Sequence, residues 1–145
     1  MCSRLLGATA SLALLAAGPA AAQSTEITIW SWNVAASALQ ATLEGFNKKY
    51  PDIKVTVQDL GNDQVFDKTL AACAAGGDGL PDIVTIENFE AELFWNRFPD
   101  CFTDMTALGY NAEMQALFPD FKRTELEVGD VAYAMPWDSG PVAVF

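Results

Sequence analysis

Between residues 26 and 86 the chain alternates strand-like and helix-like patterns, and this order restricts its fold more than any other feature. Short runs rich in β-branched residues at 26–30, 53–57 and 83–86 predict three strands. Segments of helical length and periodicity separate them. Strands that alternate with helices form βαβ units, in which successive strands run parallel. The sequence therefore predicts an α/β fold, a parallel-rich sheet with helices on both faces.

The two helices between these strands have recognisable ends. In the first, four apolar residues recur at spacings of four, three and four, and so share one helical face: Leu39, Leu43, Phe46 and Tyr50. Pro51 ends this helix, because proline lacks the N–H that a helix interior needs. In the second helix, Asp63 is expected to cap the N-terminus, and Gly76 and Gly77 to stop the C-terminus.

Beyond residue 88 the pattern is weaker. It predicts helices at 89–98 and 111–117, and strands at 131–135 and from 142 to 145. Phe94, Trp95 and Phe98 lie at helical spacing and are expected to be core residues.

Polar and aromatic residues follow the predicted strands. They are Trp32 and Asn33 after the first, Glu87, Asn88 and Glu90 after the third, and Trp137 and Asp138 after the later one. Because ligands of open α/β sheets bind at the strands' carboxyl ends, we expect these groups to meet there. Carboxylates and amides bind hydroxyl groups, and indole rings stack on apolar C–H faces. The pattern favours a carbohydrate or polyol ligand. Asp82 precedes its strand and is interpreted as a turn or capping residue.

Each of these residues also has a structural interpretation. Glu87 and Asn88 can simply cap the following helix, and Glu90 can be a first-turn charge favoured by the helix dipole. Trp137 can pack beneath a bend made by the neighbouring prolines. We expect one of Trp30 and Trp32 to face the core, and we assign Trp30 inward and Trp32 outward.

The chain contains no histidine, which removes Ser-His-Asp and Cys-His catalytic arrangements and the zinc sites that use imidazole. No cofactor or metal is expected. Glu87 and Glu90 leave one enzymatic alternative, a secreted glycoside hydrolase with paired carboxylates. Two glutamates three residues apart after one strand are poorly placed to flank a scissile bond from opposite sides, so binding is favoured over catalysis.

The net charge of −11 excludes two kinds of partner. Nucleic-acid binding needs clustered lysines and arginines, and only eight of these residues are scattered along the chain. An anionic membrane surface would repel the protein. No segment outside the N-terminus approaches the roughly 20 apolar residues of a membrane span, so no stable membrane insertion is expected.

Residues 1–22 are interpreted as a secretory signal peptide. Arg4 supplies the positive charge, residues 5–18 form a short apolar segment, and Ala20–Ala22 offer small residues for cleavage before Gln23. A buried N-terminal helix is the structural alternative. Cys2 lies far from the cleavage point, which argues against lipid attachment there. We expect an exported, periplasmic protein.

The mature chain then keeps two cysteines, Cys73 and Cys101. An even pair in an oxidising compartment favours a disulfide, although two separate buried thiols remain the alternative. A bond between them would contribute roughly 3–4 kcal/mol in the chain-entropy model.

Four segments in order resemble one protein family: 28–33, 39–57, the stretch 76–90 with its glycine turn and Leu80-Pro81-Asp82 lead-in, and 134–141. Together they resemble the sugar-binding, maltose-binding-protein-like extracellular solute-binding proteins of ABC importers.

The resemblance implies a type II periplasmic-binding-protein fold of two α/β lobes that close on a ligand. Residues 23–136 would supply part of the first lobe, and 137–145 the crossover towards a second. The chain is therefore interpreted as an N-terminal fragment. The implied function is capture of a carbohydrate and its delivery to an inner-membrane ABC permease, by a monomer that makes no chemical change in the ligand.

Overall fold

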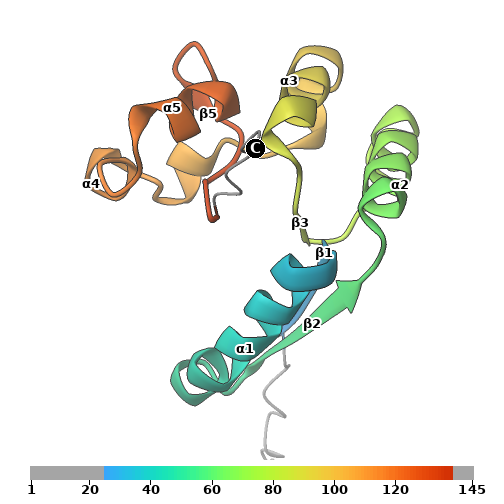
Figure 1. Ribbon diagram of the computed structural model, residues 1–145, viewed down its shortest axis with the longest axis vertical. Coiled ribbons are helices and arrows are strands. Elements are labelled where there is room, and N and C mark those ends of the chain that lie inside the picture. The colour runs from blue at the N-terminus through green and yellow to red at the C-terminus, as the bar shows by residue number, and fades with distance from the viewer. Residues whose placement is uncertain (1–24, 139–145) are drawn as a thin grey trace, which may run out of the picture.

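A computed structural model describes residues 25–138 of the chain (Figure 1). Its strands are β1 (Thr25–Ser31), β2 (Ile53–Asp59), β3 (Ile83–Val84), β4 (Glu127–Val128) and β5 (Val131–Ala132). Its α-helices are α1 (Asn33–Lys49), α2 (Asn62–Ala74), α3 (Asn88–Arg97), α4 (Ala112–Gln115) and α5 (Asp120–Arg123). Short 3₁₀ turns occupy Pro99–Cys101, Met105–Leu108 and Thr124–Leu126. The expected signal peptide and the expected strand at 142–145 lie outside the described residues.

The predicted parallel sheet is confirmed, with strand order β2-β1-β3. β1 and β2 pair along their whole length, from Thr25 opposite Ile53 to Ser31 opposite Asp59. β3 pairs with the other edge of β1. The chain thus crosses from β1 to one neighbour and then back past β1 to the other. Since such crossovers are right-handed, α1 and α2 belong on opposite faces of the sheet.

β3 is shorter than the predicted strand at 83–86. The Thr85 N–H still donates to the Trp30 carbonyl at 3.0 Å, which continues the ladder by one bond. The Thr85 hydroxyl then donates to the buried Ser31 hydroxyl at 3.0 Å. The chain turns away immediately afterwards, because α3 begins at Asn88.

The helix ends agree with the sequence prediction except for one cap. α1 ends at Lys49, before Pro51. α2 stops where Gly76 and Gly77 adopt positive φ, with the Gly77 N–H donating to the Ala72 carbonyl at 2.9 Å. The expected cap by Asp63 is wrong. Gly61 occupies the N-cap position of α2, and Asp63 lies exposed in the first turn, where its charge favours the helix dipole without capping.

The C-terminal third is less regular than predicted. α3 lies within one residue of the predicted 89–98, but the helix predicted at 111–117 is reduced to α4, capped by the Asn111 side chain. The strand predicted at 131–135 is only β5, and it pairs antiparallel with β4 rather than joining the main sheet. One further bond, from the Tyr133 N–H to the Leu126 carbonyl, extends this hairpin before Pro136, which has no N–H to donate.

The main apolar core lies around α3. Phe94 and Trp95 are buried as predicted, and Phe98 packs against the same cluster with part of its surface exposed. Phe94 makes edge-to-face contacts with Phe66 of α2 and with Phe102. The Trp95 ring stacks on Tyr133, and its indole N–H donates to the Glu125 carbonyl at 3.3 Å. The C-terminal segment is therefore held against α3.

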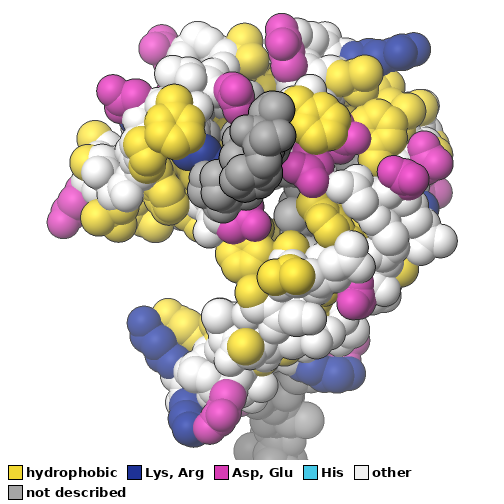
Figure 2. Space-filling view, in the orientation of Figure 1, with side chains coloured by type: hydrophobic (Ala, Val, Ile, Leu, Met, Phe, Trp, Pro, Cys, Tyr) yellow, Lys and Arg dark blue, Asp and Glu magenta, His cyan; other side chains and the backbone are white. Residues whose placement is uncertain are grey.

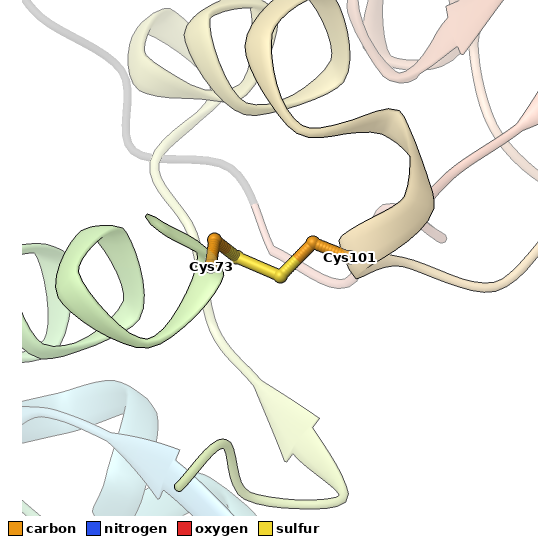
Figure 3. The surroundings of a disulfide bond; sticks show 2 residues. All are labelled: Cys73 and Cys101. Carbon is orange, nitrogen blue, oxygen red and sulfur yellow. A yellow bond between two sulfur atoms is a disulfide. The ribbon is translucent and has the colours of Figure 1, made fainter. Parts of the chain in front are cut away.

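A disulfide joins Cys73 and Cys101, as predicted. It runs from the C-terminal end of α2 to the 3₁₀ turn that follows α3, and both cysteines belong to the same core cluster (Figure 3). Their Cα atoms are 5.6 Å apart. The bond thereby fixes α2 against α3.

The visible surface carries its acidic side chains dispersed rather than gathered into one patch (Figure 2). Within residues 25–138, no helix combines the length and the apolar character that crossing a membrane requires.

Candidate functional site

The carboxyl ends of the three parallel strands bring several predicted residues together. Trp32 and Asn33 follow β1, and the segment from Thr85 to Glu90 follows β3. β2 ends beside them at Asp59, and α2 begins directly afterwards at Asn62. This edge of the sheet is where the sequence pattern predicted a ligand site.

Asn33 has a backbone conformation that few residues accept. Its φ is 44°, the single positive value among the non-glycine residues at 25–138. Asparagine tolerates this left-handed region better than most residues. The Asn33 N–H donates to the Asp59 carboxylate at 2.8 Å, which ties the turn after β1 to the end of β2. This hydrogen bond fixes the turn that presents Trp32.

Trp30 and Trp32 point as assigned. Trp30 is buried, with the Lys68 ammonium 4.6 Å from the centre of its ring. Trp32 is half-buried and lines a crevice between α2 and α3 that is too narrow, as it stands, to admit a water molecule. The polar residues around this crevice are Asn62, Thr69, Thr85 and Glu90. Apolar side chains of α2 and α3, together with Ile86 from the segment between β3 and α3, form its remaining walls.

Thr69 is the most unusual member of the crevice. Its side chain is fully buried in α2, and its hydroxyl has no hydrogen-bond partner within residues 25–138. A buried hydroxyl without a partner is costly to the folded state.

Glu87 and Glu90 place two carboxylates beside this crevice. Glu87 accepts a hydrogen bond from the Asn62 amide at 3.0 Å. Burial raises the pKa of Glu90, and the charges of Glu87 and then Asp63 raise it further. Glu90 stands in the first turn of α3 and lines the crevice, and its surroundings disfavour its ionised form.

Glu87 and Asn88 do not act as side-chain caps of α3. Glu87 occupies the N-cap position, but its side chain makes no capping hydrogen bond. The Asn88 amide donates instead to the Glu125 carboxylate at 2.8 Å. Both polar groups are thus held in position by side chains from other elements.

Trp137 and Asp138 have a different setting. Both are exposed, follow the β4-β5 hairpin rather than a strand of the main sheet, and are not among the residues that line the crevice. Their role as ligand contacts beside Trp32 stays a prediction. Asp82 has a structural role, since its carboxylate accepts the Thr28 N–H at 2.8 Å and joins the start of β3 to β1.

Sequence reasoning missed Asn62, Asp59 and Thr69. Asn62 and Asp59 stand at the end of the second strand, so the rule applied to the first and third strands would have found them. Thr69 offers no such signal, because only the packing of α2 against α3 reveals its buried hydroxyl.

The side chains at this site are suited to the recognition of a polar ligand. Within residues 25–138, no group of three or more acidic, cysteine or histidine side chains is arranged to hold a metal ion. The crevice instead combines carboxylate, amide and hydroxyl groups with one indole ring. That combination suits a ligand with hydroxyl groups and an apolar face.

Comparison with known proteins gives a consistent family. Residues 30–145 match the family model described as bacterial extracellular solute-binding protein. The chain is 31% identical to a lactose-binding protein of Rhizobium radiobacter, over 99% of this chain but 34% of that protein. The fold superposes on the crystal structure of a periplasmic solute-binding protein from Pectobacterium atrosepticum with a TM-score of 0.64, at 23% identity, over 77% of this chain and 27% of that one.

The chain thus spans about a third of the length of the curated relative. The matched family consists of solute-binding proteins and is not enzymatic, which decides against the glycoside hydrolase alternative. The α/β fold with its parallel sheet agrees with this match. The chain belongs to the bacterial extracellular solute-binding proteins.

Proposed function

We propose that this chain forms part of one lobe of a periplasmic protein that captures a carbohydrate or polyol and delivers it to an ABC permease. The observation that carries the proposal is the crevice at the strand ends, where Trp32 lies beside the hydrogen-bonding groups of Asn62, Thr69 and Glu90. The lactose-binding relative supports a sugar as the ligand.

In this proposal each group has a distinct task. The Trp32 ring stacks on the apolar face of the sugar, as aromatic rings do in such sites. The carboxylates of Glu87 and Glu90 accept hydrogen bonds from sugar hydroxyls, and these charge-assisted bonds are the stronger kind. Asn33, Asn88, Trp137 and Asp138 remain proposed contacts, with Trp137 and Asp138 at the chain's exit from this lobe.

In the proposed mechanism, this chain supplies one side of the ligand site. A second lobe would contact the other side of the ligand, and ligand contacts made to both lobes would stabilise the closed form over the open one. We propose that the permease recognises this closed form. Transport then needs neither a cofactor nor a covalent change in the ligand, and the binding protein acts as a monomer.

Titration calorimetry of the full-length gene product against a panel of mono- and disaccharides tests the proposal. We expect saturable binding of at least one sugar, and chromatography of the recovered ligand should show it unchanged. Glu87→Gln should weaken binding, because a charged acceptor is replaced by a neutral one. Glu92→Gln, an equal charge change at an exposed position of α3, is the matched control. Absence of binding across the panel would refute the sugar assignment, and cleaved sugar would refute the binding role.

A further inference from the structure

We infer that this lobe selects against negatively charged solutes, so that neutral sugars bind and their acidic derivatives are rejected. The inference rests on the proposed function and deepens it, because it defines the charge of the ligand. It is carried by the positions of the acidic and basic side chains around the crevice.

The charged side chains that line the crevice or bond to a lining residue are acidic. Glu90 lines the crevice itself, and Glu87 accepts the amide hydrogen of another lining residue, Asn62. Asp63 stands in the first turn of α2, one residue beyond Asn62. The negative charge here is already crowded, since the carboxylates of Glu87 and Asp63 both disfavour ionisation of Glu90.

Two further carboxylates near this edge accept hydrogen bonds from the chain. Asp59 accepts the backbone N–H of Asn33 in the turn that presents Trp32. Glu125 accepts the side-chain amide of Asn88. Both acids already accept hydrogen bonds from N–H groups near the strand ends. An anionic ligand would therefore meet carboxylates where it needs hydrogen-bond donors.

The basic residues of the described chain are placed elsewhere. None of them lines the crevice. Lys48 and Lys49 stand in the last turn of α1, and Lys54 follows the first residue of β2, which is the opposite end of the sheet. Lys68 lies over the buried ring of Trp30.

The other basic residues belong to the C-terminal part. The Arg97 guanidinium lies over the Phe98 ring, at the far end of α3 from Glu90. The Arg123 guanidinium in α5 lies 2.6 Å from a carboxylate oxygen of Asp120 and 3.7 Å from a carboxylate oxygen of Glu127. Lys122 precedes it in the same helix. The masked residues 139–145 contain no lysine or arginine in the sequence.

This arrangement gives specificity by repulsion. A sugar hydroxyl donates a hydrogen bond to a carboxylate, whereas a ligand carboxylate or phosphate adds a like charge that the crevice cannot neutralise. Discrimination between two ligands of similar shape commonly depends on such an unfavourable contact with the wrong one.

Matched pairs of neutral and acidic sugars test the inference on the full-length gene product. The probes are glucose with glucuronate, galactose with galacturonate, and lactose with lactobionate, measured by calorimetry at pH 7.5 and low ionic strength. For each pair whose neutral member binds, the acid should bind at least about tenfold more weakly. The double variant Glu87→Gln/Glu90→Gln should reduce this ratio by at least about threefold, whereas Glu92→Gln should leave it unchanged.

The outcomes distinguish charge selection from sugar binding itself. An acidic sugar that binds as tightly as its neutral partner would overturn the charge selection while leaving sugar binding intact. A ratio that persists in the double variant would overturn the assignment of selectivity to these two carboxylates. Failure of every probe, neutral and acidic, would overturn the proposed sugar function and this inference with it.

Discussion

The disulfide between Cys73 and Cys101 is expected to be a major source of stability, because it joins α2 to the turn after α3 inside the main core. The two cysteines are separated by 28 residues. For a closed loop of this length, the chain-entropy relation gives about 3.6 kcal/mol at 25 °C. Native domains are stable by only about 5–15 kcal/mol in total, so the loss of this cross-link should be easily measured.

Urea unfolding of the full-length gene product, followed by tryptophan fluorescence, measures this contribution. With a typical dependence of about 1–3 kcal/mol per molar urea, complete reduction should lower the unfolding midpoint by about 1 M or more. The Cys73→Ala/Cys101→Ala variant, measured with and without reductant, is the control for effects of the reductant itself. Mass spectrometry after thiol alkylation establishes the redox state. A midpoint that moves by less than about 0.3 M after verified reduction would refute the reasoning, as would two alkylated thiols in oxidised, folded protein.

Three further predictions follow from the site and from the N-terminus. Because the pKa of Glu90 is raised from about 4.5, the folded state binds this proton more tightly than the unfolded chain does. The stability that the bound proton contributes is therefore greatest below pH 4.5 and is lost as pH rises through the folded pKa. Glu90→Gln should raise the unfolding midpoint at pH 7, and an unchanged or lower midpoint there would contradict the assignment. Thr69→Val removes a buried hydroxyl that has no partner within residues 25–138, so it should stabilise the protein by up to about 1 kcal/mol in urea unfolding; a destabilised variant would contradict this reasoning. Removal of the expected signal peptide should leave a periplasmic protein that begins at Gln23. N-terminal sequencing of the exported protein that finds residues 1–22 retained would contradict this cleavage.

Local patterns were sufficient to predict the first half of the fold. β1, α1 and β2 agree with the prediction because proline and the alternation of apolar residues act within a few positions. The glycines after α2 are a similarly local signal, since they adopt the positive φ that other residues resist. The parallel pairing followed from the alternation itself, whereas the strand order β2-β1-β3 is seen only in the structure.

Features that depend on distant contacts were not predicted as well. The strand expected at 131–135 is a two-residue piece of a hairpin, because its pairing partner is β4 rather than the main sheet. Asp63 has the chemistry of a cap, but the helix begins one residue before it, so its side chain stands beyond the cap position. The buried hydroxyl of Thr69 likewise depends on packing between elements far apart in the sequence.

The central claim is that the crevice at the ends of β1 and β3 binds the sugar, and the affinity of a tryptophan variant tests it most directly. Trp32→Ala should weaken sugar binding by roughly 1–3 kcal/mol, which is the loss of one aromatic contact. Tyr50→Ala, an aromatic truncation at the opposite end of the sheet, should leave the affinity unchanged. Both variants should be compared with the wild-type full-length protein by titration calorimetry, using the sugar that binds tightest in the panel. A Trp32→Ala affinity equal to that of the wild type and of Tyr50→Ala would contradict the location of the site.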